Sequence, residues 1–152
     1  MIVAFCGHAS YISNPKDEER VFELLEKRAT KETCEFFLGV HGGFDRFACS
    51  CAKRFKECHR NVKLILITPY IPSENSERYT SYEKDQYDLI YYPALENVPP
   101  RFAISHRNRW IVDHADMIIA YVVNQYGGAY TMLRYAQRKN KEIFNLAERE
   151  LD

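Results

Sequence analysis

The chain has 152 residues, of which 46% are apolar and 14% aromatic, so it is long and apolar enough to form one globular domain around a core. This composition excludes a disordered or fibrous protein. Lys and Arg together number 21, and Asp and Glu together also number 21. The chain as a whole therefore has no basic field for nucleic acid or an anionic membrane, and any ligand must be held by local features.

No targeting or membrane-spanning signal is evident in the sequence. The apolar run at residues 2–6 is far too short for the core of a signal peptide, and no run of about 18 apolar residues occurs anywhere. The five cysteines are odd in number and lack the regular spacing of a disulfide scaffold, which fits reduced thiols. We therefore expect a cytoplasmic protein with no membrane association.

The first half of the chain alternates buried strands with amphipathic helices. Continuous apolar runs at residues 2–6 and 34–39 are each bounded by a glycine, and segments with helical spacing of apolar residues follow at 16–31 and 44–58. A third apolar run at 62–68 predicts another strand. Runs that are apolar throughout indicate strands buried on both faces, as in a parallel sheet.

The second half continues the alternation after an interruption. Residues 69–86 are polar and contain prolines, so we predict a loop there, followed by a short strand within 87–93. The remaining predicted elements are a helix at 104–115, a strand at 117–123, a helix after residue 127 and a strand at 142–146. This order predicts an α/β fold with a doubly wound, mostly parallel sheet flanked by helices, as a single domain over residues 1–152.

Three of the predicted strand-to-helix loops contain glycine, and in an open parallel sheet such loops surround the ligand site. They are CGHAS at residues 6–10, GVHGGFD at 39–45 and NQYGGAYT at 124–131. Glycine lets a ligand approach the backbone closely, and the N–H groups at a helix start attract phosphate, although tight turns also use glycine for structural reasons alone. The sequence matches neither the dinucleotide fingerprint G-x-G-x-x-G nor the P-loop, which disfavours an ordinary dehydrogenase or P-loop NTPase.

Charged and titratable side chains lie close to these loops. The RNR triplet at 107–109 offers guanidinium groups suited to bidentate phosphate binding, with a solvated helix face as the alternative. His8, His41 and His106 could donate hydrogen bonds or transfer protons near neutral pH, or could simply be satisfied loop residues. The cysteines of the predicted helix at 44–58 lack C-x-x-C spacing, so we expect no zinc or other metal site.

Taken in order, these motifs resemble the SLOG superfamily, a Rossmann-like group that includes the Lonely Guy phosphoribohydrolases, DNA-processing protein A and a YpsA-like uncharacterised branch. The resemblance covers nearly the whole chain and is nearest to the YpsA-like branch. It rests on a glycine after the first strand, a G-x-x-x-G-x-D loop, a strand that ends in proline, an RN pair before D-x-A-D, and a GG helix start followed by YA. The matching residues are Gly7; Gly39, Gly43 and Asp45; Pro69; Arg107, Asn108, Asp113, Ala115 and Asp116; and Gly127, Gly128, Tyr135 and Ala136.

The resemblance implies binding or sensing of a nucleotide or nucleotide-derived small molecule, without a separate cofactor. The residues expected to contact this ligand are Gly7, His8, Gly39, Gly43, Asp45, Arg107, Asn108, Gly127, Gly128 and Thr131. Lonely Guy enzymes carry a P-G-G-x-G-T-x-x-E motif with a catalytic glutamate, whereas this chain has Tyr130 at the third glycine and Arg134 at the glutamate. Catalysis is therefore left open, and the enzymatic alternative is an N-glycosidase that cleaves a nucleoside monophosphate with Asp45 or Asp116 as its acid.

The resemblance also bears on macromolecular partners. Family members form dimers, so we expect a homodimer or a higher homo-oligomer. The DNA-processing relatives bind single-stranded DNA through a basic surface, and the balanced charge of this chain makes nucleic acid the less favoured alternative.

Overall fold

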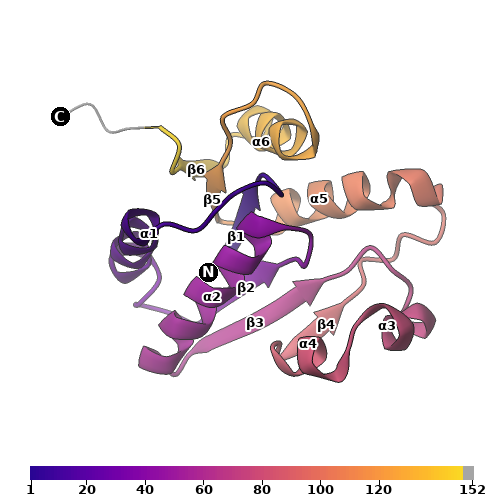
Figure 1. Cartoon of the computed structure of the whole chain (residues 1–152), viewed down its shortest axis with the longest axis horizontal. Helices are drawn as coiled ribbons and strands as arrows, with labels where there is room; N and C mark the ends of the chain where they lie inside the picture. Colours follow the sequence, from indigo (N-terminus) through magenta and orange to yellow (C-terminus); the bar gives the residue numbers. More distant parts are fainter. Residues whose placement is uncertain (149–152) are drawn as a thin grey trace.

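The computed structural model describes residues 1–148, including every side chain except those of residues 74–76. The described residues form a six-stranded sheet in the order β4-β3-β2-β1-β5-β6, and every neighbouring pair of strands is parallel (Figure 1). The strands are β1 (Ile2–Gly7), β2 (Cys34–Leu38), β3 (Val62–Ile67), β4 (Leu89–Tyr91), β5 (Met117–Tyr121) and β6 (Glu142–Asn145). The predicted α/β class with a Rossmann-like sheet is confirmed.

Strand β1 lies in the middle of the sheet and explains the apolar run at the start of the chain. Val3 is in register with Phe36 of β2 on one side and with Met117 of β5 on the other. Residues 3–6 are all buried. A strand that is paired on both edges and covered on both faces has no side chain facing water, so it needs no polar alternation.

Helices cover both faces of the sheet, which makes the fold doubly wound. The helices are α1 (Pro15–Arg28), α2 (Gly43–Cys58), α5 (Ala103–His114) and α6 (Gly128–Arg138). Val3 and Phe5 pack into the core on the side of α1 and α2, whereas Ala4 and Cys6 pack into the core on the side of α5 and α6. Figure 1 shows the two helix pairs on opposite sides of the strands. No helix in the described part of the chain is long and apolar enough to cross a membrane.

The prediction of a loop at residues 69–86 is wrong, because this segment contains two short helices, α3 (Pro72–Arg78) and α4 (Ser81–Asp85). The start of α4 is fixed by a capping box, in which the Thr80 hydroxyl accepts from the Glu83 N–H and the Glu83 carboxylate accepts from the Thr80 N–H. A proline at the first position of a helix, as at Pro72, is compatible with helix formation. The following strand is shorter than predicted, and a 3-10 helix, η1 (Pro100–Phe102), precedes α5.

The direction of strand addition reverses beside β1. From β1 the chain builds β2, β3 and β4 outward on one side, and it then crosses to the other side to form β5 and β6. The connections that leave β1 and β5 therefore run to opposite faces of the sheet. This divergence opens a crevice at the carboxyl ends of the central strands, which is where open α/β sheets bind ligands.

Gly7, at the end of β1, is required for the packing of α2 against the sheet. A Cβ atom at this position would lie 2.2 Å from Cγ of Phe44, a ring that is completely buried. Real Cβ atoms essentially never come so close, and the Phe44 ring is enclosed by Phe5, Tyr11 and Phe47. The glycine of the first loop is thus needed for helix packing.

We predict that Gly7→Ala destabilises the domain by about 1–3 kcal/mol, the usual cost of overpacking a core. The urea midpoint of unfolding, followed by circular dichroism, measures this loss. Gly128→Ala is the matched control, because a Cβ there would meet no atom within 4 Å. Equal midpoints for Gly7→Ala and the parent protein would contradict the close contact between β1 and α2.

Candidate nucleotide-binding site

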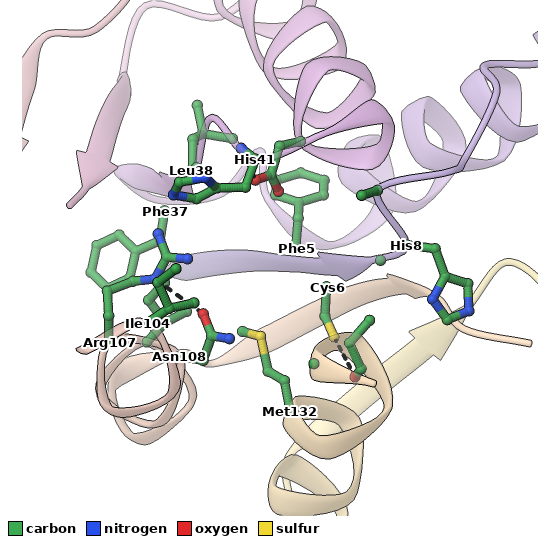
Figure 2. Close-up of a pocket in the computed structure, with 17 residues that line it drawn as sticks. Phe5, Cys6, His8, Phe37, Leu38, His41, Ile104, Arg107, Asn108 and Met132 are labelled. Carbon is green, nitrogen blue, oxygen red and sulfur yellow. Dashed lines mark hydrogen bonds between the residues drawn. The ribbon is translucent and has the colours of Figure 1, made fainter. Parts of the chain in front are cut away.

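The crevice at the carboxyl ends of the central strands contains a hollow of about 280 Å³. Its walls come from the ends of β1 and β2, the first turn of α2, one side of α5 and the N-terminal half of α6 (Figure 2). Seven of the residues predicted to bind the ligand line it, namely Gly7, His8, Gly39, Asp45, Arg107, Asn108 and Gly128. We call this space the strand-end hollow.

Arg107 is the buried cation of the hollow, with only 5% of its surface exposed. Its Nη1 donates to the carbonyl of Ile67 at the end of β3 over 2.9 Å, and its Nε donates to Oδ1 of Asn108 over 3.0 Å. Burial lowers the pKa of Arg107, but an arginine side chain stays charged in proteins. Because these bonds use two of the five guanidinium N–H groups, Arg107 is both anchored in the core and able to donate to a ligand.

Asp45, in the first turn of α2, is the acidic group of the hollow. Its Oδ2 accepts a hydrogen bond of 2.7 Å from the backbone N–H of His41. Burial raises the pKa of the Asp45 carboxyl, while the His41 N–H and the charge of Arg107 act in the opposite direction. Burial and the charge of Arg107 also lower the pKa of His41, so this imidazole is neutral at pH 7. Figure 2 shows His41 on the opposite wall from Arg107 and Asn108.

His8 joins two loops of the site. Its Nε2 accepts hydrogen bonds from the backbone N–H groups of Val123 over 3.0 Å and Asn124 over 3.3 Å. An accepting Nε2 carries no proton, so His8 is the neutral tautomer with its proton on Nδ1. The side chain therefore fixes the segment that leads into α6 onto the end of β1.

The N-terminus of α6 opens toward the hollow without side-chain obstruction. Gly127 caps the helix with φ of +92°, a conformation that favours glycine, and it forms no side-chain cap. Gly128 is exposed, and a Cβ on either glycine would meet nothing within 4 Å. The first N–H groups of a helix have no acceptor within the helix, so this end attracts anions. Thr131 lies outside the hollow, and its hydroxyl donates to the Gly127 carbonyl over 2.9 Å.

Two other candidates lie away from the hollow. The Gly43 N–H donates to the carbonyl of Ala9 over 2.8 Å, and the next N–H of α2, that of Phe44, donates to the carbonyl of His8 over 3.3 Å. The start of α2 is therefore already capped by main chain. Asp116 precedes β5 and accepts from the Ile2 N–H over 2.7 Å, at the opposite end of the sheet. Of the two proposed acids, the structure places only Asp45 in the hollow.

The sequence did not identify several residues that line the hollow, among them Cys6, Ile104 and Met132. Burial raises the pKa of the Cys6 thiol to about 12, and its Sγ donates to the Ala129 carbonyl over 3.2 Å. Cys6 is therefore a protonated wall residue and not a nucleophile. The sequence marks none of these three residues by a motif. Only their places in the fold, at the end of β1 and on α5 and α6, bring them to the hollow. Among the described residues no group of three or more His, Cys, Asp or Glu side chains could hold a metal ion.

Charge is unevenly distributed along this neutral chain. Residues 101–141, which include α5 and α6, contain seven Lys and Arg but only two Asp and no Glu. The remaining segments carry the compensating excess of acidic residues, because the whole chain is balanced. The balanced total, on which the argument against nucleic acid rested, therefore does not describe the side of the sheet where α5 and α6 lie.

Comparison with known proteins establishes the fold. No family model matches the sequence. The chain is 25% identical over 141 residues, covering 81% of each protein, to the uncharacterised SPβ prophage-derived protein YoqJ of Bacillus subtilis (strain 168). The structure of this chain superposes on DNA processing protein A (DprA) of Streptococcus pneumoniae with a TM-score of 0.63 at 16% identity, over 99% of this chain and 51% of the DprA chain.

A second solved structure, DprA of Helicobacter pylori, gives a TM-score of 0.61 at 18% identity, over 100% of this chain and 67% of that one. That structure describes the single-stranded DNA binding mode of the Helicobacter protein. This chain spans about half the length of the Streptococcus protein. At these identities the likeness concerns the fold alone, so the chain has the Rossmann-like α/β fold found in DNA processing protein A.

Proposed function

We propose that the strand-end hollow binds a nucleotide or a nucleotide-derived small molecule, with a phosphate between Arg107 and the N-terminus of α6. The observation that carries this proposal is a buried guanidinium, anchored on the Ile67 carbonyl, in the same hollow as an unobstructed helix start. Charge-assisted hydrogen bonds from arginine and the partial positive charge of a helix N-terminus both favour phosphate. The order of motifs supports membership of the SLOG superfamily.

The rest of the hollow offers partners for a sugar and a base. Asp45 and Asn108 supply acceptors and donors for hydroxyl groups, and apolar atoms of Ile104 and Met132 supply a surface for an uncharged ring. Binding without turnover is favoured because Arg134, at the position where related enzymes have a glutamate, is exposed and does not line the hollow. Its Nη1 donates to Oε1 of Gln137 over 3.0 Å.

Two alternatives each rest on one observation. The raised pKa of Asp45 supports an N-glycosidase, in which a protonated Asp45 gives its proton to the departing base while water attacks the sugar carbon and then gives a proton back to the Asp45 carboxylate. The basic segment of residues 101–141 supports single-stranded DNA binding, and the Helicobacter structure of similar fold is described as having a single-stranded DNA binding mode.

We predict that Gly128→Val and Arg107→Lys each weaken binding of the best nucleoside monophosphate from a screen, measured by isothermal titration calorimetry. The valine side chain would cover the N–H groups at the start of α6, and lysine lacks the planar fork of arginine. The loss expected for one charge-assisted hydrogen bond is about 1.5–3 kcal/mol. In the parent protein, the same ligand at about 100 times its Kd should add about 2.7 kcal/mol of stability.

Arg60→Lys is the control for this experiment, because Arg60 is exposed and lies outside the hollow, between α2 and β3. It should bind as the parent does. Gly128→Val should unfold at the same urea concentration as the parent, since position 128 has free space around it. Parent-like affinity in both site variants would overturn the assignment of the phosphate position.

The glycosidase alternative predicts release of free base from a nucleoside monophosphate, detected by chromatography. Asp45→Asn should abolish that release, because an amide cannot donate the proton. The rate should fall as pH rises through the pKa of Asp45, since only the protonated carboxyl is active. If the nucleotide stabilises the folded domain against unfolding but no free base is released, the function is binding without catalysis.

The raised pKa of Asp45 also predicts how stability depends on pH. At a pH above 3.8, the ordinary pKa of an aspartate, Asp45 is deprotonated in the unfolded chain but still holds its proton in the folded domain. The unfolded state then binds fewer protons than the folded state, so the free energy of unfolding falls as pH rises. The Asp45→Asn variant should not show this decline, and its amide oxygen can still accept the hydrogen bond from the His41 N–H. The difference in unfolding free energy, parent minus variant, should decrease between pH 3 and the folded-state pKa of Asp45. A difference that is constant or increases with pH would contradict the burial argument.

A further inference from the structure

A groove between α5 and α6 continues the strand-end hollow along the outside of the domain. It has a volume of about 320 Å³ and is bordered by Arg101, Arg109, Thr131, Tyr135 and Arg138. We call it the α5–α6 groove. It shares four wall residues with the hollow, namely Ile104, Asn108, Gly128 and Met132. The two spaces therefore meet at the N-terminus of α6.

The α5–α6 groove presents cations around one aromatic ring. The guanidinium carbon atoms of Arg109 and Arg138 lie 5.6 Å and 5.9 Å from the centre of the Tyr135 ring. The ring itself is held by a hydrogen bond of 2.7 Å from its hydroxyl to Oδ1 of Asp113. Arg101, Arg109 and Arg138 are exposed, and the ion pairs formed among the described residues involve other cations. The groove thus has positive charge that no neighbouring carboxylate neutralises by direct contact.

The α5–α6 groove, at about 320 Å³, adds a second space of similar size to the hollow. Pockets that bind small molecules span about 300–1,000 Å³, and the hollow alone, at 280 Å³, lies just below this range. The eleven residues of α6 give the groove a wall of about 16 Å. A nucleotide with its first phosphate at Gly128 would therefore leave the hollow along a path lined by arginine.

We propose that the α5–α6 groove is a second anion subsite, which binds a further phosphate of a nucleotide ligand that spans the hollow and the groove. This inference rests on the proposed nucleotide function of the hollow. The ligand class is a nucleotide with at least two phosphates, joined either through a pyrophosphate or through a phosphodiester. Arg109 and Arg138 bind the second phosphate, and contacts with the Tyr135 ring restrain both guanidinium groups.

The test compares ligands that differ by one phosphate unit, using calorimetric titrations of the parent protein and of the double variant Arg109→Ala/Arg138→Ala. One series pairs AMP with ADP, and the other pairs dTMP with the 5′-phosphorylated dinucleotide pdTpdT and a ten-residue thymidine strand. In at least one series the parent should gain about tenfold or more in affinity from the second phosphate. The double variant should lose this gain while its affinity for the monophosphate changes less than twofold.

Lys31→Ala/Arg60→Ala is the matched control, since it removes two exposed positive charges from the loops at the opposite end of the sheet. It should keep the gain. A gain in the AMP series alone identifies a pyrophosphate-linked small molecule, whereas a gain in the thymidine series identifies a phosphodiester, and a further gain with the ten-residue strand identifies single-stranded DNA.

The groove and the hollow can fail separately. If monophosphates bind and Gly128→Val weakens them, but the second phosphate adds nothing in either series, the groove proposal is overturned while the hollow keeps its function. The proposal also fails if the double variant and the control lose the same part of the affinity gained from the second phosphate, because the loss then reflects the total charge of the protein. If no ligand binds the parent at all, the proposed function itself fails.

Discussion

The close contact between Gly7 and Phe44 is the constraint on which the site depends. Because the end of β1 has no side chain there, the first turn of α2 lies directly against the strand, and its N–H groups are capped by the loop that leaves β1. That placement sets Asp45 at the edge of the hollow. The same loop contains His8, which holds the segment leading into α6. Packing of one ring thus positions the acidic group and, through His8, the helix start that faces it.

The hollow combines two buried or partly buried groups of opposite sign that do not form a direct ion pair. Removing Arg107 and Asp45 from water is costly, and each is supported by main-chain groups, the Ile67 carbonyl for one and the His41 N–H for the other. Because Arg107 and Asp45 form no direct ion pair, the ligand that we propose has an anionic part and a separate hydrogen-bond donor. A phosphate ester of a sugar has both, whereas a simple anion has only the first.

The central strands were predictable because burial on both faces leaves a continuous apolar run, as in residues 2–6 and 117–121. The helices α3 and α4 were missed since prolines and polar residues outweighed a capping box that was visible at Thr80 and Glu83. The sequence could not distinguish a glycine needed for packing from one next to an open space. The residue that requires a glycine at position 7 is Phe44, which lies in the later helix α2. Asp45 and Asp116 looked equivalent as well, until the topology put one at each end of the strands.

The neutral tautomer of His8 has a consequence for the thermodynamics of recognition. An imidazole that accepts two backbone N–H groups ties the loop before α6 to the central strand before any ligand arrives. Ordering a loop on binding costs conformational entropy, and a loop that is already ordered does not add this cost. The end of α6 that we propose binds an anion is therefore preorganised by the two hydrogen bonds that His8 Nε2 accepts.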